Sequence, residues 1–274
     1  MVAFPHCKIN LGLNVLRKRE DGYHDIETVF FPIPVFDIVE IVSNNQTTRY
    51  TNSGIDTGEY ENNLCVKAYH LVKNDYPSLP SASIHLHKRI PVGAGLGGGS
   101  SDASSVLLLI NEKYKLGIPE SKLFDYAIQL GSDCPFFLND HASFATGRGE
   151  ILSPVKLDLS EFKIVLVNPG IHVNTKEIFQ KVIPSIPAKR IDKIIVQNVE
   201  TWKQELENDF EKVVFPMHSE LSEIKNILYR QGAEYASMTG TGSTLFGIYK
   251  KDKRIIPSFN KKYFVETISL ARLY

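Results

Sequence analysis

A glycine-rich segment near the middle of the sequence has the composition of a phosphate-binding loop. Five of the 18 glycines fall within the seven residues from Gly93 to Gly99, and Ser100 and Ser101 follow directly. Amide groups without side chains that lead into a helix N-terminus offer converging N–H donors and the positive end of the helix dipole. We therefore expect this segment to bind phosphate, with a flexible surface loop as the alternative.

Three known nucleotide-binding motifs fit this segment incompletely. Gly93, Gly95 and Gly98 have the dinucleotide spacing, but residues 115–120 form a turn into a helix where that motif needs a second strand and an acid. No lysine lies between Gly93 and Ser101, which excludes a Walker A loop. The Val-Ala-Ile-Lys and His-Arg-Asp partners of a protein-kinase loop do not occur in the sequence. A dinucleotide-dependent oxidoreductase stays open as a weakened alternative.

The hydrophobic pattern predicts the elements that position this loop. Residues 83–89 alternate apolar with polar side chains, which is typical of a strand, and this strand enters the loop. Residues 100–114 form the clearest predicted helix, because Ser and Asp stand at its start before a dense apolar segment. A second helix over 120–130 ends at Gly131, a suitable C-cap residue.

The rest of the chain mixes strands and helices. Apolar runs and alternation predict strands over 7–15, 25–31, 35–42, 162–167, 245–250 and 264–270, and helices over 64–74, 176–182, 200–210 and 219–231. Residues 43–63 form a polar, turn-rich section. This order favours an α+β fold over strict βαβα alternation. We expect two domains that divide near residues 154–162.

The charge balance limits the partners. The 274 residues contain 31 Lys and Arg and 31 Asp and Glu, so we expect no nucleic-acid binding, and any anion must be held locally. Cys7, Cys65 and Cys134 lie too far apart to predict a disulfide framework or a zinc site. The N-terminus lacks a secretory pattern and the apolar runs are too short to span a membrane. We expect a cytoplasmic protein with no membrane segment.

The glycine-rich segment closely resembles the phosphate loop of the GHMP family of small-molecule kinases. The run from Pro91 to Ser101, Pro-Val-Gly-Ala-Gly-Leu-Gly-Gly-Gly-Ser-Ser, follows that family's Pro-x-x-x-Gly-Leu-Gly-x-x-Ser-Ser pattern. The resemblance implies a two-domain α+β fold, with an N-terminal α/β domain like ribosomal protein S5 domain 2 over 1–155 and a C-terminal ferredoxin-like α/β domain over 156–274. It implies that ATP is bound by Pro91, Val92, Gly93, Ala94, Gly95, Leu96, Gly97, Gly98, Gly99, Ser100 and Ser101.

Three further segments point to one branch of this family. They are residues 8–11 (Lys-Ile-Asn-Leu) with 21–24 (Asp-Gly-Tyr-His), residues 131–135 (Gly-Ser-Asp-Cys-Pro), and residues 239–243 (Thr-Gly-Thr-Gly-Ser). This branch phosphorylates the 2-hydroxyl of a methylerythritol that carries a cytidine diphosphate group, a step in isoprenoid precursor synthesis. Kinases of mevalonate or homoserine share the central loop and are the nearest alternatives.

The resemblance implies that Lys8 and Asp133 are the catalytic pair. Phosphorylation of an alcohol needs positioning, neutralisation of the γ-phosphate charge and a proton acceptor. Asp133 precedes the apolar residues 134–138, which would limit solvent around it, and Lys8 could stabilise both the carboxylate and the transferred phosphoryl group. Without the motif context, Asp133 would be a turn former and Lys8 a solvated strand residue.

The resemblance also implies the residues that bind the cytidyl substrate. Tyr23 and Phe179 would stack on cytosine and His24 would contact its polar edge. Phe179 could equally be the apolar anchor of an amphipathic helix. The remaining implied substrate residues are Asn10, Thr175, Thr239 and Gly240.

Charged residues flank the loop in the sequence. Lys88 and Arg89 could reinforce nucleotide binding, although such a pair at a strand end is more often solvated. Asp102 would point away from the loop and stabilise the helix N-terminus, with a role through magnesium and water as the minor alternative. Because the histidines form no ligand set, we expect Mg²⁺ to accompany the phosphates of ATP without a protein cage.

The partners that follow are small molecules: ATP and a cytidyl diphosphate alcohol. The protein would be a monomer or a homodimer. A module that binds ATP without transferring phosphate remains the alternative to an enzyme, and it would tolerate the loss of Lys8 or Asp133.

Overall fold

The chain forms two compact units that interleave along the sequence. The computed structural model describes residues 1–44, 46–58, 60–139, 141–255 and 259–270. The first unit comprises Met1–Lys8, Ile33–Val92 and Gly97–Asp140, and the second comprises Ile9–Pro32, Gly93–Leu96 and His141–Tyr274. The expected domains are continuous in sequence, and their boundary between residues 155 and 156 stays a prediction.

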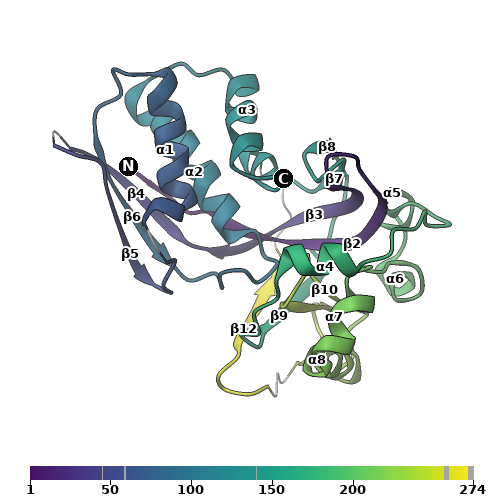
Figure 1. The fold of residues 1–274 in the computed structure, drawn as a ribbon. Helices are drawn as coiled ribbons and strands as arrows, with labels where there is room; N and C mark the ends of the chain where they lie inside the picture. The colour runs from purple at the N-terminus through teal and green to yellow at the C-terminus, as the bar shows by residue number, and fades with distance from the viewer. Residues whose placement is uncertain (45, 59, 140, 256–258, 271–274) are drawn as a thin grey trace. The chain divides into compact units, whose positions relative to one another are not determined.

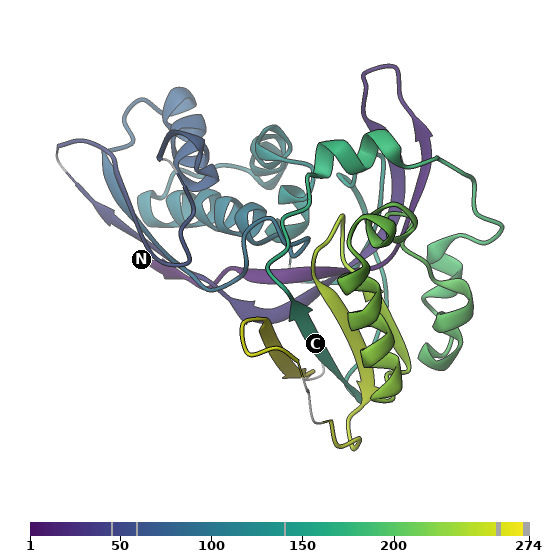
Figure 2. The ribbon, with the colours of Figure 1, turned by 60° about the horizontal axis from the view of Figure 1, so that its bottom comes forward.

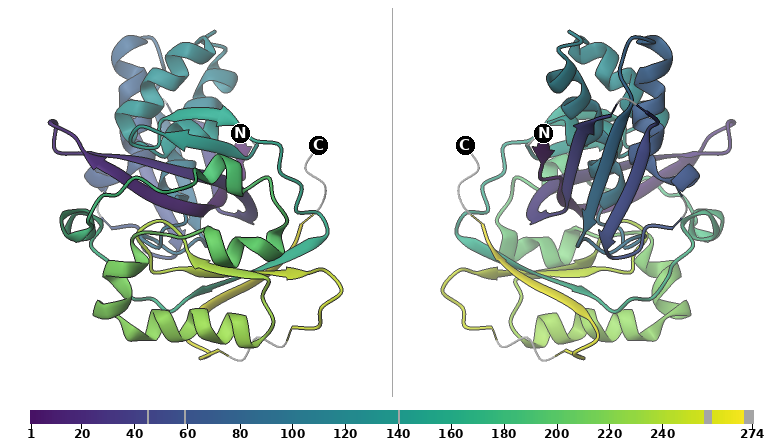
Figure 3. Two further views of the ribbon diagram at one scale, coloured as in Figure 1. Left: turned by 90° about the vertical axis from the view of Figure 1, so that its right-hand side faces the viewer. Right: turned by 90° about the vertical axis from the view of Figure 1, so that its left-hand side faces the viewer.

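The first unit packs three helices on one face of a sheet. The sheet has the order β1 (Val2–Ala3), β4 (Ile38–Ser43), β6 (Ala82–Lys88) and β5 (Arg49–Gly54). Strand β6 pairs antiparallel with β4 and parallel with β5. The helices are α1 (Leu64–Asp75), α2 (Gly98–Tyr114) and α3 (Glu120–Leu130), with short 3₁₀ turns η1 (Tyr60–Asn62) and η2 (Cys134–Leu138). Figure 1 shows α1, α2 and α3 on the same side of this sheet, and the right view of Figure 3 shows the strands in front of them.

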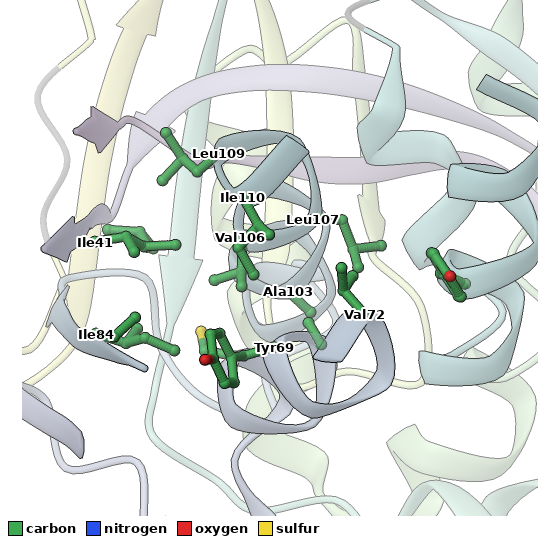
Figure 4. Packing of buried hydrophobic residues seen from close by; sticks show 14 of the residues in the cluster. Ile41, Tyr69, Val72, Ile84, Ala103, Val106, Leu107, Leu109 and Ile110 are labelled. Atoms are coloured by element: carbon green, nitrogen blue, oxygen red, sulfur yellow. The ribbon is translucent and has the colours of Figure 1, made fainter. Parts of the chain in front are cut away.

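The predicted alternation in β6 decides which face of this sheet is buried. Ile84 and Leu86 are almost fully buried, whereas Ser83, His85 and His87 on the other face are half-buried. Side chains of α1 and α2, among them Tyr69 and Val106, complete the core (Figure 4). Full burial of each such aliphatic side chain contributes about 1.5–3 kcal/mol, so this core fixes the position of α2 and of the loop before it.

The second unit contains two sheets. The first has the order β2 (His6–Lys18), β3 (His24–Phe36), β7 (Ser143–Thr146) and β8 (Ile151–Pro154), and β2 and β3 each begin or end in the first unit. The second sheet has the order β10 (Tyr235–Met238), β11 (Leu245–Lys250), β9 (Phe162–Asn168) and β12 (Phe264–Ser269). The helices are α4 (Thr175–Lys181), α5 (Ile191–Ile194), α6 (Val199–Glu205), α7 (Glu211–Met217) and α8 (Ser219–Arg230).

Helix α8 covers the second sheet because its apolar face is continuous. Leu221, Ile224 and Leu228 are buried at the i, i+3, i+7 spacing of one helix face. They share a core with Val165 of β9 and Leu245 of β11. Figure 2 shows α8 along this sheet. Among the described residues, no helix is both long and apolar enough to cross a membrane.

The predicted helix over residues 200–210 is wrong in its second half. Helix α6 ends at Glu205, and the next residues form a bridge in which Leu13 pairs with Asn208. The amide of Leu13 donates to the carbonyl of Glu207, and the amide of Asp209 donates to the carbonyl of Leu13. Backbone pairing with β2 has therefore replaced the helical hydrogen bonds that local sequence favours.

The predicted polar section over residues 43–63 contains a strand. Strand β5 has the sequence Arg-Tyr-Thr-Asn-Ser-Gly and pairs with β6 at the edge of the sheet. Its side chains are mostly exposed or half-buried, so the apolar alternation that marks other strands is missing. Strands β7, β8 and β10, of four residues each, also escaped prediction.

Candidate active site

The C-terminal half of the glycine loop forms the N-terminus of α2 in the first unit. Gly97 is the N-cap, with a φ of 69°, and the helix begins at Gly98, two residues before the predicted start. No side chain in the described part of the chain caps this helix. The amide of Ser101 is the first to bond into the helix, to the carbonyl of Gly97 at 3.0 Å. The amides of residues 98–100 are thus the orphan donors to which an anion can bind.

Lys8 and Asp133 form an ion pair beside this helix start. Lys8 is 3% exposed, and its Nζ lies 3.3 Å from Oδ2 of Asp133, whose side chain is 34% exposed. A Cβ at Gly97 would lie 3.1 Å from Cε of Lys8 and 2.8 Å from Cζ of Phe137. The first unit therefore brings together the glycine loop, a buried ammonium group and a solvent-accessible carboxylate.

Local backbone structure holds Asp133 in place. Helix α3 ends at Leu130 with Gly131 as its C-cap, and Asp133 directly precedes η2, whose residues Cys134 and Phe136 are buried. The hydroxyl of Ser104 in α2 donates to the carbonyl of Cys134 at 2.8 Å. The segment that carries Asp133 is thus fixed to the same helix whose N-terminus forms the loop.

Lys88 lies below the loop in a buried ion cluster, not in solvent. Its Nζ donates to Oδ2 of Asp37 at 2.5 Å and to Oδ2 of Asp102 at 2.6 Å, and all three side chains are at most 2% exposed. The expectation that Lys88 is a nucleotide contact or a solvated strand end does not match this burial. Asp102 points to Lys88, and a Cβ at Gly98 would lie 2.9 Å from Nζ of Lys88.

Burial and two competing charges set the protonation of this cluster. Burial raises the pKa of Asp102 to about 7, with Lys88 opposing and Asp37 adding to the rise. The pKa of Lys88 is raised, because the attraction of Asp102 and Asp37 outweighs burial. The second carboxylate oxygen of Asp37 accepts the amides of Arg89 and Ile90, so Asp37 is the better solvated of the two acids.

The N-terminal half of the glycine loop belongs to the second unit, where it contacts the second glycine motif. The hydroxyl of Thr239 donates to the carbonyl of Gly95 at 3.0 Å, and the amide of Thr244 donates to the carbonyl of Ala94 at 3.2 Å. The amide of Asn10 donates to the hydroxyl of Thr239 at 3.0 Å. Asn10 and Thr239 are both buried, and their hydrogen bonds connect strand β2 to the loop. Their roles toward the substrate stay predictions.

The Asp-Gly-Tyr-His turn places an exposed aromatic ring. Asp21 accepts the amide of Tyr23 at 3.0 Å, and the Tyr23 side chain is 54% exposed. The guanidinium carbon of Arg148 lies 4.7 Å from the centroid of the Tyr23 ring. Sequence reasoning missed Arg148, and its place between two turn glycines was the available signal.

His24 and Phe179, predicted to act on the same base, lie against each other. Their ring centroids are 5.3 Å apart, and Phe179 also contacts Phe210 at 4.7 Å. Burial, followed by the charge of Lys18, lowers the pKa of His24, so its imidazole is neutral at pH 7 and can donate and accept one hydrogen bond each. Ile178 is the buried anchor of α4, whereas Phe179 is half-buried.

The remaining predicted residues lie near these groups or on α4. Thr175 is exposed at the start of α4, with its hydroxyl 3.0 Å from that of Thr241. A Cβ at Gly240 would lie 3.3 Å from Cα of Gly95, so the two glycine motifs approach closely. Within the described ranges, no three His, Cys, Asp or Glu side chains are grouped as a metal site would require. After α2 the chain enters α3 rather than a strand, which removes the βαβ context of the dinucleotide alternative.

Family models and curated relatives match most of the chain. Residues 63–141 match the GHMP kinases N terminal domain, and residues 190–264 match the GHMP kinases C terminal domain. A protein of Azobacteroides pseudotrichonymphae, named 4-diphosphocytidyl-2-C-methyl-D-erythritol kinase, is 50% identical over 95% of this chain and 97% of its own length. A protein of the same name from Bacteroides fragilis is 46% identical over 93% of this chain and 94% of its own.

Solved structures share this fold. A crystal structure of 4-(cytidine 5'-diphospho)-2C-methyl-D-erythritol kinase matches with a TM-score of 0.75 and 33% identity, over 90% of this chain and 89% of that chain. The mevalonate kinase of Methanococcus jannaschii matches with a TM-score of 0.69 and 14% identity, over 92% of each chain, which is similarity of fold alone.

Proposed function

Because the chain belongs to the GHMP kinase family, we propose that it transfers the γ-phosphate of ATP to the 2-hydroxyl of 4-diphosphocytidyl-2-C-methyl-D-erythritol. The products would be the 2-phosphate and ADP, in the non-mevalonate synthesis of isoprenoid precursors. The observation that carries this proposal is the Lys8–Asp133 pair beside the uncapped N-terminus of α2. The relatives of 46–50% identity favour the cytidyl substrate over mevalonate or homoserine.

In the proposed reaction, Asp133 accepts the proton of the substrate hydroxyl while the oxygen of that hydroxyl attacks the γ-phosphorus. The partial exposure of Asp133 leaves it accessible to a substrate, whereas Lys8 is buried behind it. The ammonium group of Lys8 pairs with Asp133 and stabilises negative charge on the transferred phosphoryl group. The residues from Pro91 to Ser101 bind the phosphates of ATP, with backbone amides as the principal donors.

We propose that the second unit recognises the cytidine group. Tyr23 and Phe179 stack on the base, and the neutral imidazole of His24 reads its polar edge, which has both donors and acceptors. Thr175 contacts the methylerythritol portion. Asn10 on β2 contacts the same portion, and Thr239 and Gly240 support the substrate from the second glycine motif.

The remaining parts of the proposal concern cofactor, assembly and location. Mg²⁺ accompanies ATP and neutralises charge on its phosphates. The enzyme works on small molecules as a monomer or homodimer and binds no nucleic acid. The three cysteines are free and buried, which suits a reducing compartment such as the cytoplasm. Residues 1–155 would form the ATP-binding domain and residues 156–274 the C-terminal domain.

A panel of alcohols tests the substrate. The protein is incubated with Mg-ATP and, separately, with the cytidyl substrate, mevalonate or homoserine, and the products are weighed by mass spectrometry. We expect one added phosphate on the cytidyl substrate only. Transfer to mevalonate alone would refute the substrate, and ATP binding without any transfer would favour a silent nucleotide-binding module.

A substitution tests the role of Asp133. Asp133→Asn should lower kcat by about 10²–10⁴-fold with both ligands still bound, because the amide cannot accept the proton. Asp125→Asn, at an exposed position on α3, is the matched control and should turn over normally. Nearly full turnover in Asp133→Asn would show that another group is the base.

A further inference from the structure

The cluster of Asp37, Lys88 and Asp102 contains a carboxylate oxygen with no partner. Oδ2 of Asp102 accepts from Lys88, but its Oδ1 is buried and has no hydrogen-bond partner among the described residues. An ionised carboxylate in that position is only half solvated by the protein. A protonated one is uncharged and costs much less to bury, and its hydrogen bond with Asp37 favours this form.

The cluster carries one more negative than positive charge when both acids are ionised. The other titratable groups around it do not compensate. Burial raises the pKa of Cys65 on α1 well above its usual value, raises that of Cys7 on β2 to about 12, and raises that of Tyr50 on β5, so all three are neutral. Arg89, which follows β6, has an exposed side chain, and the ammonium group of Lys8 beside Gly97 is paired with Asp133.

This excess negative charge lies directly below the loop that we assign to ATP. A Cβ at Gly98 would lie 2.9 Å from Nζ of Lys88, and Asp102 follows Gly98 by four residues on α2, about 6 Å along the helix axis. A polyphosphate at the helix N-terminus would therefore repel an ionised Asp102 through a buried, weakly screened path.

We propose that Asp102 takes up a proton when the phosphates of ATP bind at the N-terminus of α2, so that the buried cluster becomes neutral while the nucleotide is bound. The proton comes from solvent and returns to it when the nucleotide leaves. Lys88 then remains as an ammonium group beneath Gly98, paired with Asp37. This inference rests on the proposed function, since it requires ATP at this loop.

The pKa of Asp102 makes the uptake measurable near neutral pH. With a value of about 7 in the free protein, Asp102 is mostly ionised at pH 8. A rise of one to two units on ATP binding would then add roughly half a proton or more per ATP. By linkage, ATP affinity should weaken as the pH rises from 7 to 9, by roughly fivefold for a pKa rise of one unit and by roughly 25-fold for a rise of two.

Calorimetry of Mg-ATP binding tests the inference. Binding without the alcohol substrate is measured at pH 8 in two buffers of different ionisation enthalpy, which gives the protons taken up per ATP. We expect roughly half a proton or more for the wild type and near zero for Asp102→Asn. Asp75→Asn removes an exposed carboxylate of α1 in the same unit and should behave as the wild type.

The outcomes separate this inference from the proposed function. ATP binding without proton uptake, or equal uptake in Asp102→Asn, would overturn the inference alone. Failure of the wild type to bind ATP would overturn both. Should Asp102→Asn fail to fold, the ¹³C chemical shift of the Asp102 carboxyl in the wild type decides: it must move toward the protonated value when ATP is added at pH 8.

Discussion

Alanine at Gly95 should separate the two glycine motifs. Gly95 has a φ of +79°, and a Cβ there would lie 2.1 Å from the carbonyl oxygen of Thr239. Ordinary van der Waals contact begins at 3.4 Å, so the two backbone segments must move apart by about 1.3 Å. The carbonyl oxygen is a backbone atom and the Cβ is bonded directly to the backbone. No side-chain rotation can therefore relieve this contact.

Gly93 provides a matched control for the strain of a positive φ. It has a φ of +65°, and the nearest atom to its Cβ would be Nδ1 of His172 at 3.9 Å. Gly93→Ala should therefore cost about 1–2 kcal/mol of unfolding free energy through backbone strain alone. Gly95→Ala adds the loss of the hydrogen bonds from Thr239 and Thr244 at about 1 kcal/mol each, for a total near 4 kcal/mol.

Thermal unfolding and steady-state kinetics measure the difference. At about 2–4 °C per kcal/mol for a chain of this size, Tm should fall by roughly 4 °C in Gly93→Ala and by roughly 10 °C in Gly95→Ala. KM for ATP should also rise more in Gly95→Ala, because the displaced loop no longer presents its amides. Equal Tm and KM changes in the two variants would refute the contact between Gly95 and Thr239.

Three further changes have expected outcomes. Tyr23→Ala should raise KM for the cytidyl substrate by roughly 10- to 100-fold through lost stacking, with KM for ATP unchanged, whereas Tyr263→Ala on the same unit should change neither. Since the pKa of Asp102 is raised in the folded state, the folded protein binds more protons than the unfolded chain between about pH 4 and 7, so stability falls as pH rises through this window. The urea midpoint of unfolding should fall less from pH 5 to pH 8 in Asp102→Asn than in the wild type, and His24 titrates equally in both proteins. Identical falls would contradict the raised pKa of Asp102. ATP affinity should drop by no more than about tenfold between 20 and 200 mM salt, because amides rather than a basic patch bind the phosphates, and a steeper loss would contradict that account.

Local patterns predicted the elements that carry the loop. The alternation in β6 and the apolar segment of α2 have physical causes that act within a few residues, and the structure confirms both. The start of α2 was predicted two residues late, because Gly98 and Gly99 are poor helix formers and tertiary contacts hold them there.

Pairings between distant segments could not be predicted from local pattern. Strand β5 owes its existence to β6, and the end of α6 to the bridge between Leu13 and Asn208. Both depend on partners remote in sequence, and neither has an apolar signature of its own. The same holds for Lys8 and Asp133, whose association in the first unit was implied by family motifs and not by spacing.

The ion cluster was missed for a different physical reason. A lysine at a strand end and an aspartate in the first turns of a helix are each common solvated residues, and only Asp37, an acid in an apolar stretch, was an unusual signal. Burying two carboxylates with one lysine is unfavourable, because one negative charge has no counter-ion. A chain with no net charge must hold a polyanion by local groups. A buried cluster that loses its excess negative charge by accepting one proton lets the loop above it bind phosphate without a surrounding basic patch. Protonation of Asp102 and binding of the phosphates of ATP would then favour each other, which offsets part of the cost of burying this carboxyl group.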